Sequence, residues 1–432
     1  MSWQDRSNEI KKALTNPNMG DKYIWGIFIA LAVVSLVESY SASSREITAS
    51  GIYLPIIKHG GMLLMGGLMV FIIQLFSYEK YLKLIFAFII ASIILVIYVS
   101  IFGDMINGAR RSITVLGFSL QSAEFAKISI VMLISWVLAR NQKDGTATNL
   151  GVKICAVSVI IFCGLLFKQG LTNALLLMAV SLSMMIIGGV QWSKLGLVLV
   201  AYLGIGLLGL GIMEVKDMVT SEPETEIIVS SGGTTFTQDG VQNRKGTWVA
   251  RLERYFDKTP LYEQPINSIN QQEMFSYMAQ ANGGIIGVFP GNSRECSRLP
   301  LAFSDYIYSI IVEEWGFIGG FILLILYLWL LARAGVIATK CNKAFPALLV
   351  MGMAVMIVFQ ALFHMAINVG VFPVSGQPLP LISKGGTSIL VTSIAFGFML
   401  SVSKYAQITG KISKKAESGL PNELISNNPM QF

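Results

Sequence analysis

The sequence predicts an all-α integral membrane protein, a bundle of about ten transmembrane helices with one large extracytoplasmic loop. Hydrophobic residues make up 53% of the 432 residues and charged residues only 13%, whereas a soluble domain has about 25% charged residues. The apolar residues are gathered in runs of about 20, the length that spans a hydrocarbon core as a helix. No strand-like alternation of apolar and polar residues repeats along the chain.

The expected elements follow one another in a simple order. Residues 1–22 form an N-terminal tail, residues 23–213 hold the first seven membrane helices, and residues 305–404 hold the last three. Residues 214–304 form the large extracytoplasmic loop, and residues 405–432 form a C-terminal tail. The apolar runs lie approximately at 23–42, 54–76, 81–102, 124–139, 151–167, 171–190, 193–213, 306–332, 346–368 and 386–403.

Basic residues predict the orientation of this bundle. Short cytoplasmic loops retain Lys and Arg, and with ten spans most basic residues of the short loops fall on the side that holds both termini. Both termini are therefore predicted to be cytoplasmic. The net charge of +7 reflects this bias, so we do not expect nucleic acid as a partner. The first 22 residues are polar and contain no apolar core of a signal peptide, which predicts that the first span is an uncleaved anchor.

The large loop has two parts of different composition. Its first part, "SEPETEIIVSSGGTTFTQDG", is polar and rich in Gly, Ser and Thr, and we interpret it as mobile. Its second part, from Trp248 onward, mixes aromatic, charged and glycine residues. In that part we expect short helices packed on the bundle, because loops of this length are often functional.

Polar residues gather at the outer ends of the spans. The loop between the third and fourth spans supplies Arg110 and Arg111, and the start of the fourth span supplies Glu124 and Lys127. Ionisable groups at membrane depth are costly and mark functional sites. The alternative for the two arginines is contact with lipid headgroups, which the sequence alone leaves open.

Three segments carry a resemblance to a known family. The first reads "NGARRS" and "QSAEFAK", the second "GGIIGVFPGNS", "LPLAFSDY" and "EE", and the third "GVFPVSGQPLPLISKGGTS". In this order they resemble the SEDS family of peptidoglycan glycosyltransferases, whose members include FtsW, RodA and SpoVE. The resemblance extends from "SYSAS" at 39–43 to the last span and looks more like a division-type FtsW member. Ser112, Leu301 and Gly170 depart from the family pattern.

The resemblance implies an activity and its setting. Members of the family are taken to polymerise lipid II, an undecaprenyl-pyrophosphate-linked disaccharide pentapeptide, on the outer face of the bacterial cytoplasmic membrane. The implied partners are a class B penicillin-binding protein, which is a transpeptidase, and other divisome membrane proteins. No cofactor is certain and a divalent cation is possible, although the sequence has no Cys/His cluster typical of a zinc site.

Three other functions stay open at this stage. They are a lipid II flippase, an elongation-type polymerase similar to RodA, and a non-catalytic scaffold that activates a transpeptidase. A flippase needs a polar path through the bilayer, whereas the ionisable residues here gather at the outer end. We therefore expect a septal glycosyltransferase of cell division.

Asp305, at the threshold of the eighth span, is the predicted general base. The reaction needs a base for the attacking sugar hydroxyl, and a carboxylate near an apolar rim suits proton acceptance. The alternative is a helix N-cap, where aspartate is also favoured. From the residues alone the two readings are equal, and the family pattern favours catalysis. Glu313 and Glu314 lie too far along the same helix to share a reacting atom with Asp305, and we interpret them as structural.

Basic residues are the predicted counter-charges of the leaving pyrophosphate. Arg110, Arg111, Lys127 and Lys384 are assigned to substrate binding, because guanidinium and ammonium groups bind phosphate oxygens. Lys384 has the alternative of a solvated loop lysine. Glu124 lies one helical turn before Lys127, so the two side chains are spaced to pair. A structural ion pair and a direct role in the reaction both stay open.

Small residues complete the predicted substrate site. Gly283 and Gly284 permit close backbone approach or a tight turn beside the substrate. Ser383 lies in the third motif, immediately before Lys384. We assign all three to substrate binding as implied by their motifs.

Overall fold

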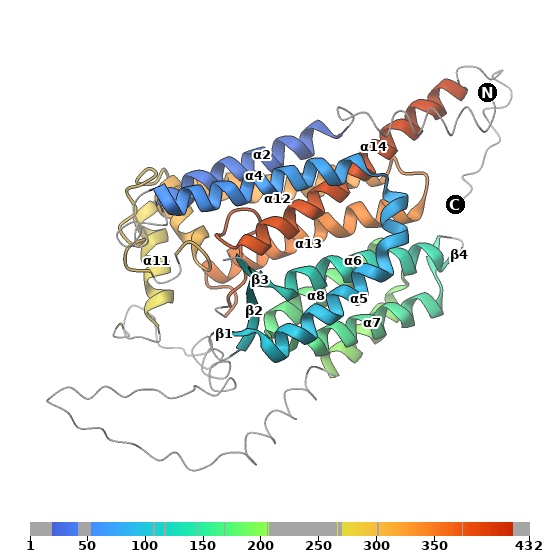
Figure 1. The fold of residues 1–432 in the computed structure, drawn as a ribbon, viewed down its shortest axis with the longest axis horizontal. Helices are drawn as coiled ribbons and strands as arrows, with labels where there is room; N and C mark the ends of the chain where they lie inside the picture. The colour runs from blue at the N-terminus through green and yellow to red at the C-terminus, as the bar shows by residue number, and fades with distance from the viewer. Residues whose placement is uncertain are drawn as a thin grey trace, which may run out of the picture.

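The computed structural model describes residues 20–41, 53–106, 109–115, 118–143, 145–167, 169–204, 206, 266, 270–299, 302–373 and 375–417 (Figure 1). Its helices are α2 (Lys22–Ser41), α4 (Tyr53–Leu75), α5 (Tyr78–Phe102), α6 (Ser122–Arg140), α7 (Asn149–Phe167), α8 (Leu171–Ile187), α11 (Gln271–Gly283), α12 (Ile307–Ala338), α13 (Ala344–Asn368) and α14 (Gly386–Glu417). Its strands are β1 (Asp104–Ile106), β2 (Ala109–Val115), β3 (Phe118–Gln121), β4 (Gln142–Lys143) and β5 (Thr146–Ala147).

The described part of the chain is a multi-pass helical membrane bundle. It contains 8 helices that are long and apolar enough to cross a membrane. The sixth and seventh predicted runs are represented by two shorter apolar helices, Leu171–Ile187 and Trp192–Gly204. Each predicted apolar run thus overlaps an apolar helix. Most of the N-terminal tail, the polar first part of the large loop and the end of the C-terminal tail lie outside the described residues.

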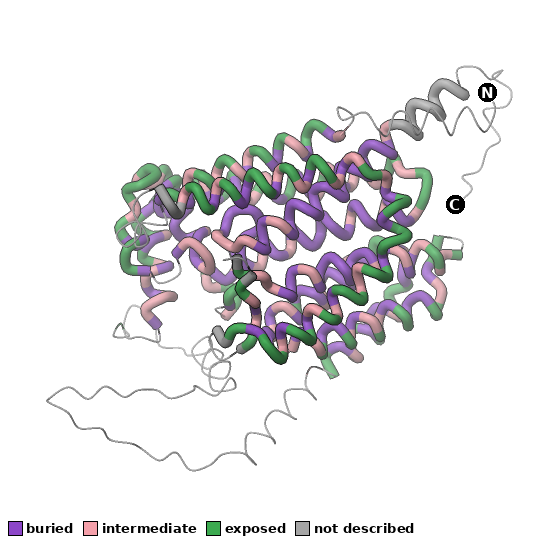
Figure 2. The backbone as a smooth tube through the Cα atoms, in the orientation of Figure 1, coloured by how far each residue is buried: buried purple, intermediate pink, exposed green. Residues whose placement is uncertain are grey.

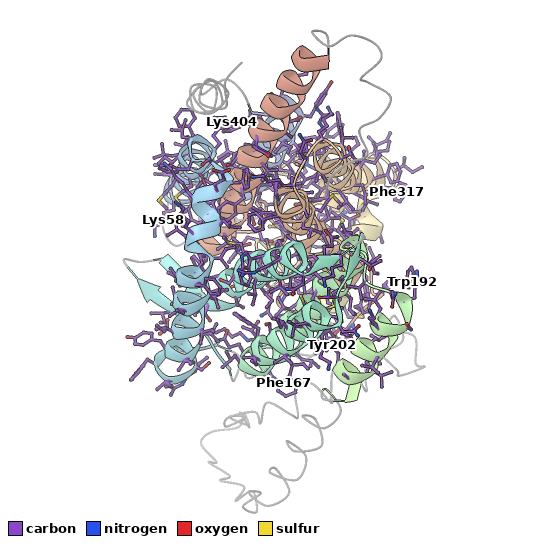
Figure 3. The ribbon with its side chains drawn as sticks, turned by 90° about the vertical axis from the view of Figure 1, so that its right-hand side faces the viewer. Lys58, Phe167, Trp192, Tyr202, Phe317 and Lys404 are labelled. Atoms are coloured by element: carbon purple, nitrogen blue, oxygen red, sulfur yellow. The ribbon has the colours of Figure 1, made fainter. Side chains whose placement is uncertain are left out.

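Three helices form the centre of the bundle. α6, α13 and α14 are the most buried of the candidate spans, and Figure 2 shows them largely purple between outer helices with exposed faces. α13 packs against α6 and α8 on one side and against α12 and α14 on the other. Seen along the bundle (Figure 3), side chains fill the space between the helices, with Tyr202 inside and Trp192 at the rim. Side chains of α13 can therefore reach both halves of the molecule.

Long-range polar contacts identify the two ends of the bundle. At one end, the backbone N–H of Asp21 donates to Ser403 Oγ (3.0 Å). At the same end, Arg333 donates two hydrogen bonds to Asp21 Oδ2, from Nε at 3.0 Å and from Nη2 at 2.6 Å. At the other end, Ser41 Oγ donates to the carboxylate of Glu314. The start of α2 and the later part of α14 therefore lie at the same end.

The segment between α5 and α6, which we assigned to a loop, forms an antiparallel three-stranded sheet. Its order is β1-β2-β3, and Ser112 of β2 lies opposite both Asp104 of β1 and Gln121 of β3. Residues such as Ile113 and Thr114 favour strands, but the strands are too short for periodicity along the chain to reveal them. β3 leads directly into α6. Gln121 N donates to Thr387 Oγ1 (3.0 Å), which ties the sheet to the start of α14.

A break in α12 receives the glycine-rich segment that follows α11. Gly316 has φ 72° inside the helix, so its neighbours lack helical hydrogen-bond partners. Val288 N and Phe289 N donate to the carbonyl groups of Glu313 (3.0 Å) and Glu314 (2.8 Å). In return, Phe317 N donates to Gly284 O (2.9 Å). The irregular backbone of both segments is thereby satisfied, as a chain at membrane depth requires.

Candidate functional site

A polar cavity of about 250 Å³ lies at the sheet-bearing end of the bundle. Segments from six parts of the chain form its walls, and it brings together four predicted site residues, Arg111, Glu124, Asp305 and Lys384. Its other lining residues are Ser112, Ser119, Gln121, Ala123, Gln169, Gly170, Thr172, Asn173, Ser304, Ser375, Gly376, Gln377, Pro378, Gly385, Gly386, Thr387 and Ser388. We call this space the polar cavity.

Asp305 lines the polar cavity and precedes the N-cap residue of α12. That N-cap residue is Tyr306, whose side chain makes no capping hydrogen bond. Asp305 is half-buried, and its Oδ1 accepts a hydrogen bond from Ser304 Oγ (2.9 Å). Its backbone carbonyl accepts one from Asn368 Nδ2 (3.1 Å). The geometry thus gives no support to the N-cap reading of this aspartate.

Arg111 and Asp305 both lie beside the bare backbone of Gly376. A β-carbon on Gly376 would lie 3.3 Å from Asp305 Oδ2 and 3.7 Å from Arg111 Nη1. The carboxylate and the guanidinium therefore border one small volume, which Gly376 keeps clear. In this volume a carboxylate can accept a proton and a guanidinium can stabilise an anion.

The strand separates Arg110 from Arg111, which the sequence analysis treated as a pair. Successive side chains of a strand point to opposite faces of a sheet, and both arginines belong to β2. Arg111 is partly buried and lines the polar cavity. Arg110 is exposed and is not among the lining residues. Only one of the two guanidinium groups is therefore aimed at the space beside Asp305.

Glu124 and Lys127 form the ion pair that their spacing predicts. Lys127 Nζ lies 2.6 Å from Glu124 Oε1, and the two side chains are only 1% and 3% exposed. Lys127 Nζ also donates to Gln360 Oε1 (2.7 Å). Glu124 lines the polar cavity, whereas Lys127 does not. Lys127 therefore supports the cavity wall indirectly, through its contacts with Glu124 and Gln360.

Ser383 and Lys384 run beside the backbone that leads to Asp305. Ser383 Oγ donates to Ser304 O (2.8 Å) and accepts from Leu379 N (2.7 Å). Lys384 N donates to Phe303 O (2.9 Å), and Lys384 Nζ lies 4.9 Å from the centre of the Phe303 ring. Lys384 lines the polar cavity and Ser383 does not. Ser383 therefore contributes by holding the 303–304 backbone.

Gly283 and Gly284 lie away from the polar cavity, at the break in α12. A β-carbon on Gly283 would overlap the carbonyl oxygen of Val312. Gly284 has φ 52° and its carbonyl accepts from Phe317 N. Glu313 and Glu314 are fully buried at the same break. Backbone N–H groups of Arg294 and Gly291 donate to them (both 3.1 Å), which supports the structural reading of this pair.

Several polar atoms in the cavity wall have no partner among the described residues. They are the side-chain oxygens Ser375 Oγ, Gln377 Oε1 and Ser388 Oγ, and all three residues are at most 4% exposed. Buried polar atoms are normally hydrogen-bonded. The wall therefore holds polar atoms whose hydrogen-bonding capacity is unused within the described residues.

α13 carries a polar face that the sequence motifs did not indicate. Gln360, His364 and Asn368 follow one another at four-residue intervals in an otherwise apolar helix, so they share one face. Gln360 Nε2 donates to Pro378 O (3.1 Å), and His364 Nδ1 donates to Gln377 O (2.6 Å). The four-residue spacing of these side chains could have revealed the polar face from the sequence. The spacing alone does not show which cavity wall each side chain contacts.

The described residues contain no group of three or more His, Cys, Asp or Glu side chains arranged to hold a metal ion. Two departures from the family pattern, Ser112 and Gly170, line the polar cavity. Leu301, the third, lies outside the described residues.

Comparisons with known proteins agree with the fold and with the predicted family. The family model of the FtsW, RodA and SpoVE cell cycle proteins matches residues 21–408. A probable peptidoglycan glycosyltransferase FtsW of Trichlorobacter lovleyi is 30% identical over 330 residues, covering 75% of this chain and 77% of the relative. One of the same name from Enterococcus hirae is 26% identical over 94% of this chain and 98% of the relative.

Two solved structures share the fold. The rod shape determining protein RodA of Thermus thermophilus has a TM-score of 0.60 at 22% identity, covering 89% of this chain and 97% of that chain. A chain from a structure titled as a peptidoglycan synthase complex has a TM-score of 0.62 at 22% identity, covering 90% of this chain and 99% of that chain. Because the family model spans most of the sequence and the bundle matches these folds, the chain belongs to the FtsW/RodA/SpoVE family of cell cycle proteins.

Proposed function

We propose that the chain is a peptidoglycan glycosyltransferase that polymerises lipid II, with Asp305 as the general base. The observation that carries this proposal is that Arg111 and Asp305 both lie beside the same face of Gly376 in one polar cavity. A base and a cation are the two groups that transfer of a sugar from a pyrophosphate needs. The names of the curated relatives, probable peptidoglycan glycosyltransferase FtsW, support the same activity.

The reaction balances with the groups present. The acceptor hydroxyl oxygen attacks the anomeric carbon of the donor sugar and forms a new carbon–oxygen bond, while its proton moves to the Asp305 carboxylate. The bond between the anomeric carbon and the pyrophosphate oxygen breaks, and the pyrophosphate takes the electron pair. Arg111 and Lys384, which line the polar cavity, stabilise that developing charge. Asp305 then releases the proton to solvent.

The remaining site residues have distinct parts in this proposal. Ser375, Gln377 and Ser388 supply polar side chains to the wall of the substrate site. Lys127 keeps Glu124 in place, and Ser383 holds the backbone beside Asp305. Arg110, exposed on the other face of β2, meets lipid headgroups or solvent. Gly283 and Gly284 support α12 and do not touch the substrate.

The setting that we propose is the bacterial cytoplasmic membrane. Both termini lie in the cytoplasm and the polar cavity opens at the outer face, where the basic-residue distribution places it. The partner is a class B penicillin-binding protein, with further membrane proteins of the divisome. One similar fold comes from a complex whose title describes coordinated polymerisation and crosslinking, and the FtsW names of the relatives favour septal synthesis.

The deciding experiment is polymerisation of labelled lipid II by the purified chain together with its transpeptidase partner. Asp305→Asn keeps the size of the side chain but removes the proton acceptor, so the rate should fall by about 10²–10⁴ while lipid II still binds. Thermal unfolding in detergent checks that the variant is folded. Polymerisation by Asp305→Asn at nearly the wild-type rate would refute the assignment and would favour the scaffold or flippase functions.

A further inference from the structure

The polar face of α13 contacts two walls of the polar cavity from behind. Gln360, His364 and Asn368 are at most 3% exposed, and none of them is among the lining residues. Burying a polar side chain is costly unless it is hydrogen-bonded. Each of the three makes at least one hydrogen bond to a residue outside α13. Their partners, and not α13 itself, form the cavity surface.

Asn368 joins α13 to the backbone at Asp305. Its Nδ2 donates to the carbonyl of Asp305 (3.1 Å) and to the carbonyl of His364 (2.9 Å). Its Oδ1 accepts from Ser309 Oγ (2.8 Å) and from Ser309 N (3.3 Å). The amide thus fixes the residue that carries the carboxylate and the first turn of α12 at once. Asn368 is fully buried, so water does not compete for these bonds.

Gln360 and His364 join α13 to a second wall of the polar cavity, formed by residues 375–378. His364 Nδ1 donates to Gln377 O (2.6 Å), and Gln360 Nε2 donates to Pro378 O (3.1 Å). Gln377 Nε2 in turn donates to Asn173 Oδ1 (2.9 Å), so the wall also reaches the start of α8. Gln360 Oε1 accepts from Lys127 Nζ (2.7 Å). This wall carries the unpartnered Ser375 and Gln377 oxygens described above.

We propose that Gln360, His364 and Asn368 are positioning residues of glycosyl transfer with separate tasks. Asn368 sets the position of the Asp305 backbone, and Gln360 and His364 set the 375–378 wall that holds the substrate. The inference rests on the proposed function of the polar cavity. α13 lies at the centre of the bundle and packs against α6, α8, α12 and α14. These three side chains therefore anchor both walls of the cavity to the same helix.

The two tasks predict different kinetic effects. A misplacement of about 1 Å costs about 10²-fold in rate when it disturbs the reacting geometry. Moving Asp305 changes the chemical step, whereas moving the 375–378 wall changes mainly substrate binding and, through Gly376, the chemical step to a smaller extent. A general loss of packing would instead change both constants and the stability of the whole bundle. Comparing the changes in kcat and in KM therefore distinguishes a positioning residue from a residue that only supports the fold.

The kinetic test uses the full chain with its transpeptidase partner and labelled lipid II. Asn368→Asp keeps the acceptor for Ser309 but cannot donate to the Asp305 carbonyl, and we expect kcat to fall by about 10- to 100-fold with KM nearly unchanged. His364→Leu removes the bond to Gln377 O, and we expect KM to rise with a smaller change in kcat. His364→Asn, whose amide N–H can replace Nδ1–H, should restore part of the loss.

The structural readout is hydrogen–deuterium exchange, which needs no turnover. Asn368→Asp should speed exchange in residues 302–309 and His364→Leu in residues 375–380, with the rest of the bundle unchanged. Ser135→Ala is the matched control, since Ser135 is fully buried but bonds only to Val131 O of its own helix (2.7 Å). It should alter neither region. If Asn368→Asp does not fold, Asn368→Ser, which adds no charge, is measured in the same way.

The outcomes separate two possible errors. Uniform exchange increases, or equal changes of kcat and KM in both α13 variants, would overturn the positioning proposal. A folded wild-type complex that makes no glycan would overturn the proposed function instead. The exchange pattern would then still decide whether the contacts of α13 fix the two walls.

Discussion

The carboxylate of Asp305 and the guanidinium of Arg111 border the same face of Gly376, with a β-carbon there lying 3.3 Å and 3.7 Å from them. The two charged groups come from the segment just before α12 and from β2, and Gly376 comes from the connection between α13 and α14. The small size of this glycine keeps the space beside the carboxylate and the guanidinium open. Its replacement is therefore a direct test of the proposed reaction centre.

Gly376→Val should abolish polymerisation while changing the unfolding temperature little, because its methyl groups would occupy the reaction space and not the packed core. Gly376→Ala should retain reduced turnover, since a β-carbon 3.3 Å from Asp305 Oδ2 is a tight contact that requires the carboxylate to shift by a few tenths of an ångström. The measurements are lipid II polymerisation and thermal unfolding in detergent. Gly335→Val is the control, because a β-carbon at Gly335 meets no atom within 4 Å. Full activity of Gly376→Val would place the reaction elsewhere.

Arg111→Gln and Arg110→Gln should differ sharply, although the residues are neighbours. Loss of Arg111 removes a counter-charge from the polar cavity, and we expect turnover to fall by about 10²-fold or more. Loss of the exposed Arg110 should cost at most about fivefold, the effect of about 1 kcal/mol for a surface charge. Steady-state polymerisation and lipid II binding measure both. Equal losses would show that β2 does not orient the two side chains as described.

Lys127→Met should destabilise the bundle mainly because it leaves Glu124 buried without its cation. Breaking a buried ion pair from one side costs about 3–5 kcal/mol, and both side chains are almost fully buried. The double variant Lys127→Met with Glu124→Gln should recover a large part of that loss. Thermal or denaturant unfolding of the two variants gives the comparison. A double variant no more stable than Lys127→Met alone would contradict the ion-pair role.

Substitutions at the break in α12 should rank by the space around each glycine. Gly316→Ala and Gly287→Ala combine a left-handed backbone with overlap onto a facing backbone atom, so we expect little folded protein. Gly291→Ala has a positive φ but open surroundings, and should cost only about 1–2 kcal/mol. Yields of monodisperse protein and unfolding temperatures test this order. Similar stability of all three variants would argue against the backbone pairing between the two segments.

Cysteine labelling from the two sides of the membrane tests the orientation. Cysteines introduced at positions 145 and 420 should react only from the cytoplasm, and one at position 240 only from outside. Burial raises the pKa of the Cys341 thiol to about 12, so at pH 8 this native thiol stays protonated and should label slowly. A cytoplasmic position 240 would invalidate the ten-span arrangement and place the polar cavity on the wrong side.

The sequence by itself determined the features that depend on neighbours along the chain. Length and hydropathy of the apolar runs located the membrane helices, because a span must be about 20 apolar residues long whatever it packs against. The Glu124–Lys127 pair followed from spacing within one helix. The three motifs also pointed to Asp305, Arg111 and Lys384, which the structure brings to one cavity.

The tertiary structure decided how these residues face one another. The short strand β2 turns Arg111 inward and Arg110 outward, and its strand form depends on pairing with β1 and β3. Gly283 and Gly284 lie at the break in α12, where two segments of the chain meet. Local periodicity does not reveal such a contact. Asn368 meets the Asp305 carbonyl across 63 positions of sequence. Such contacts arise only when helices pack, since hydrogen bonds and close approaches between distant segments are set by the assembled bundle and not by the propensity of either segment.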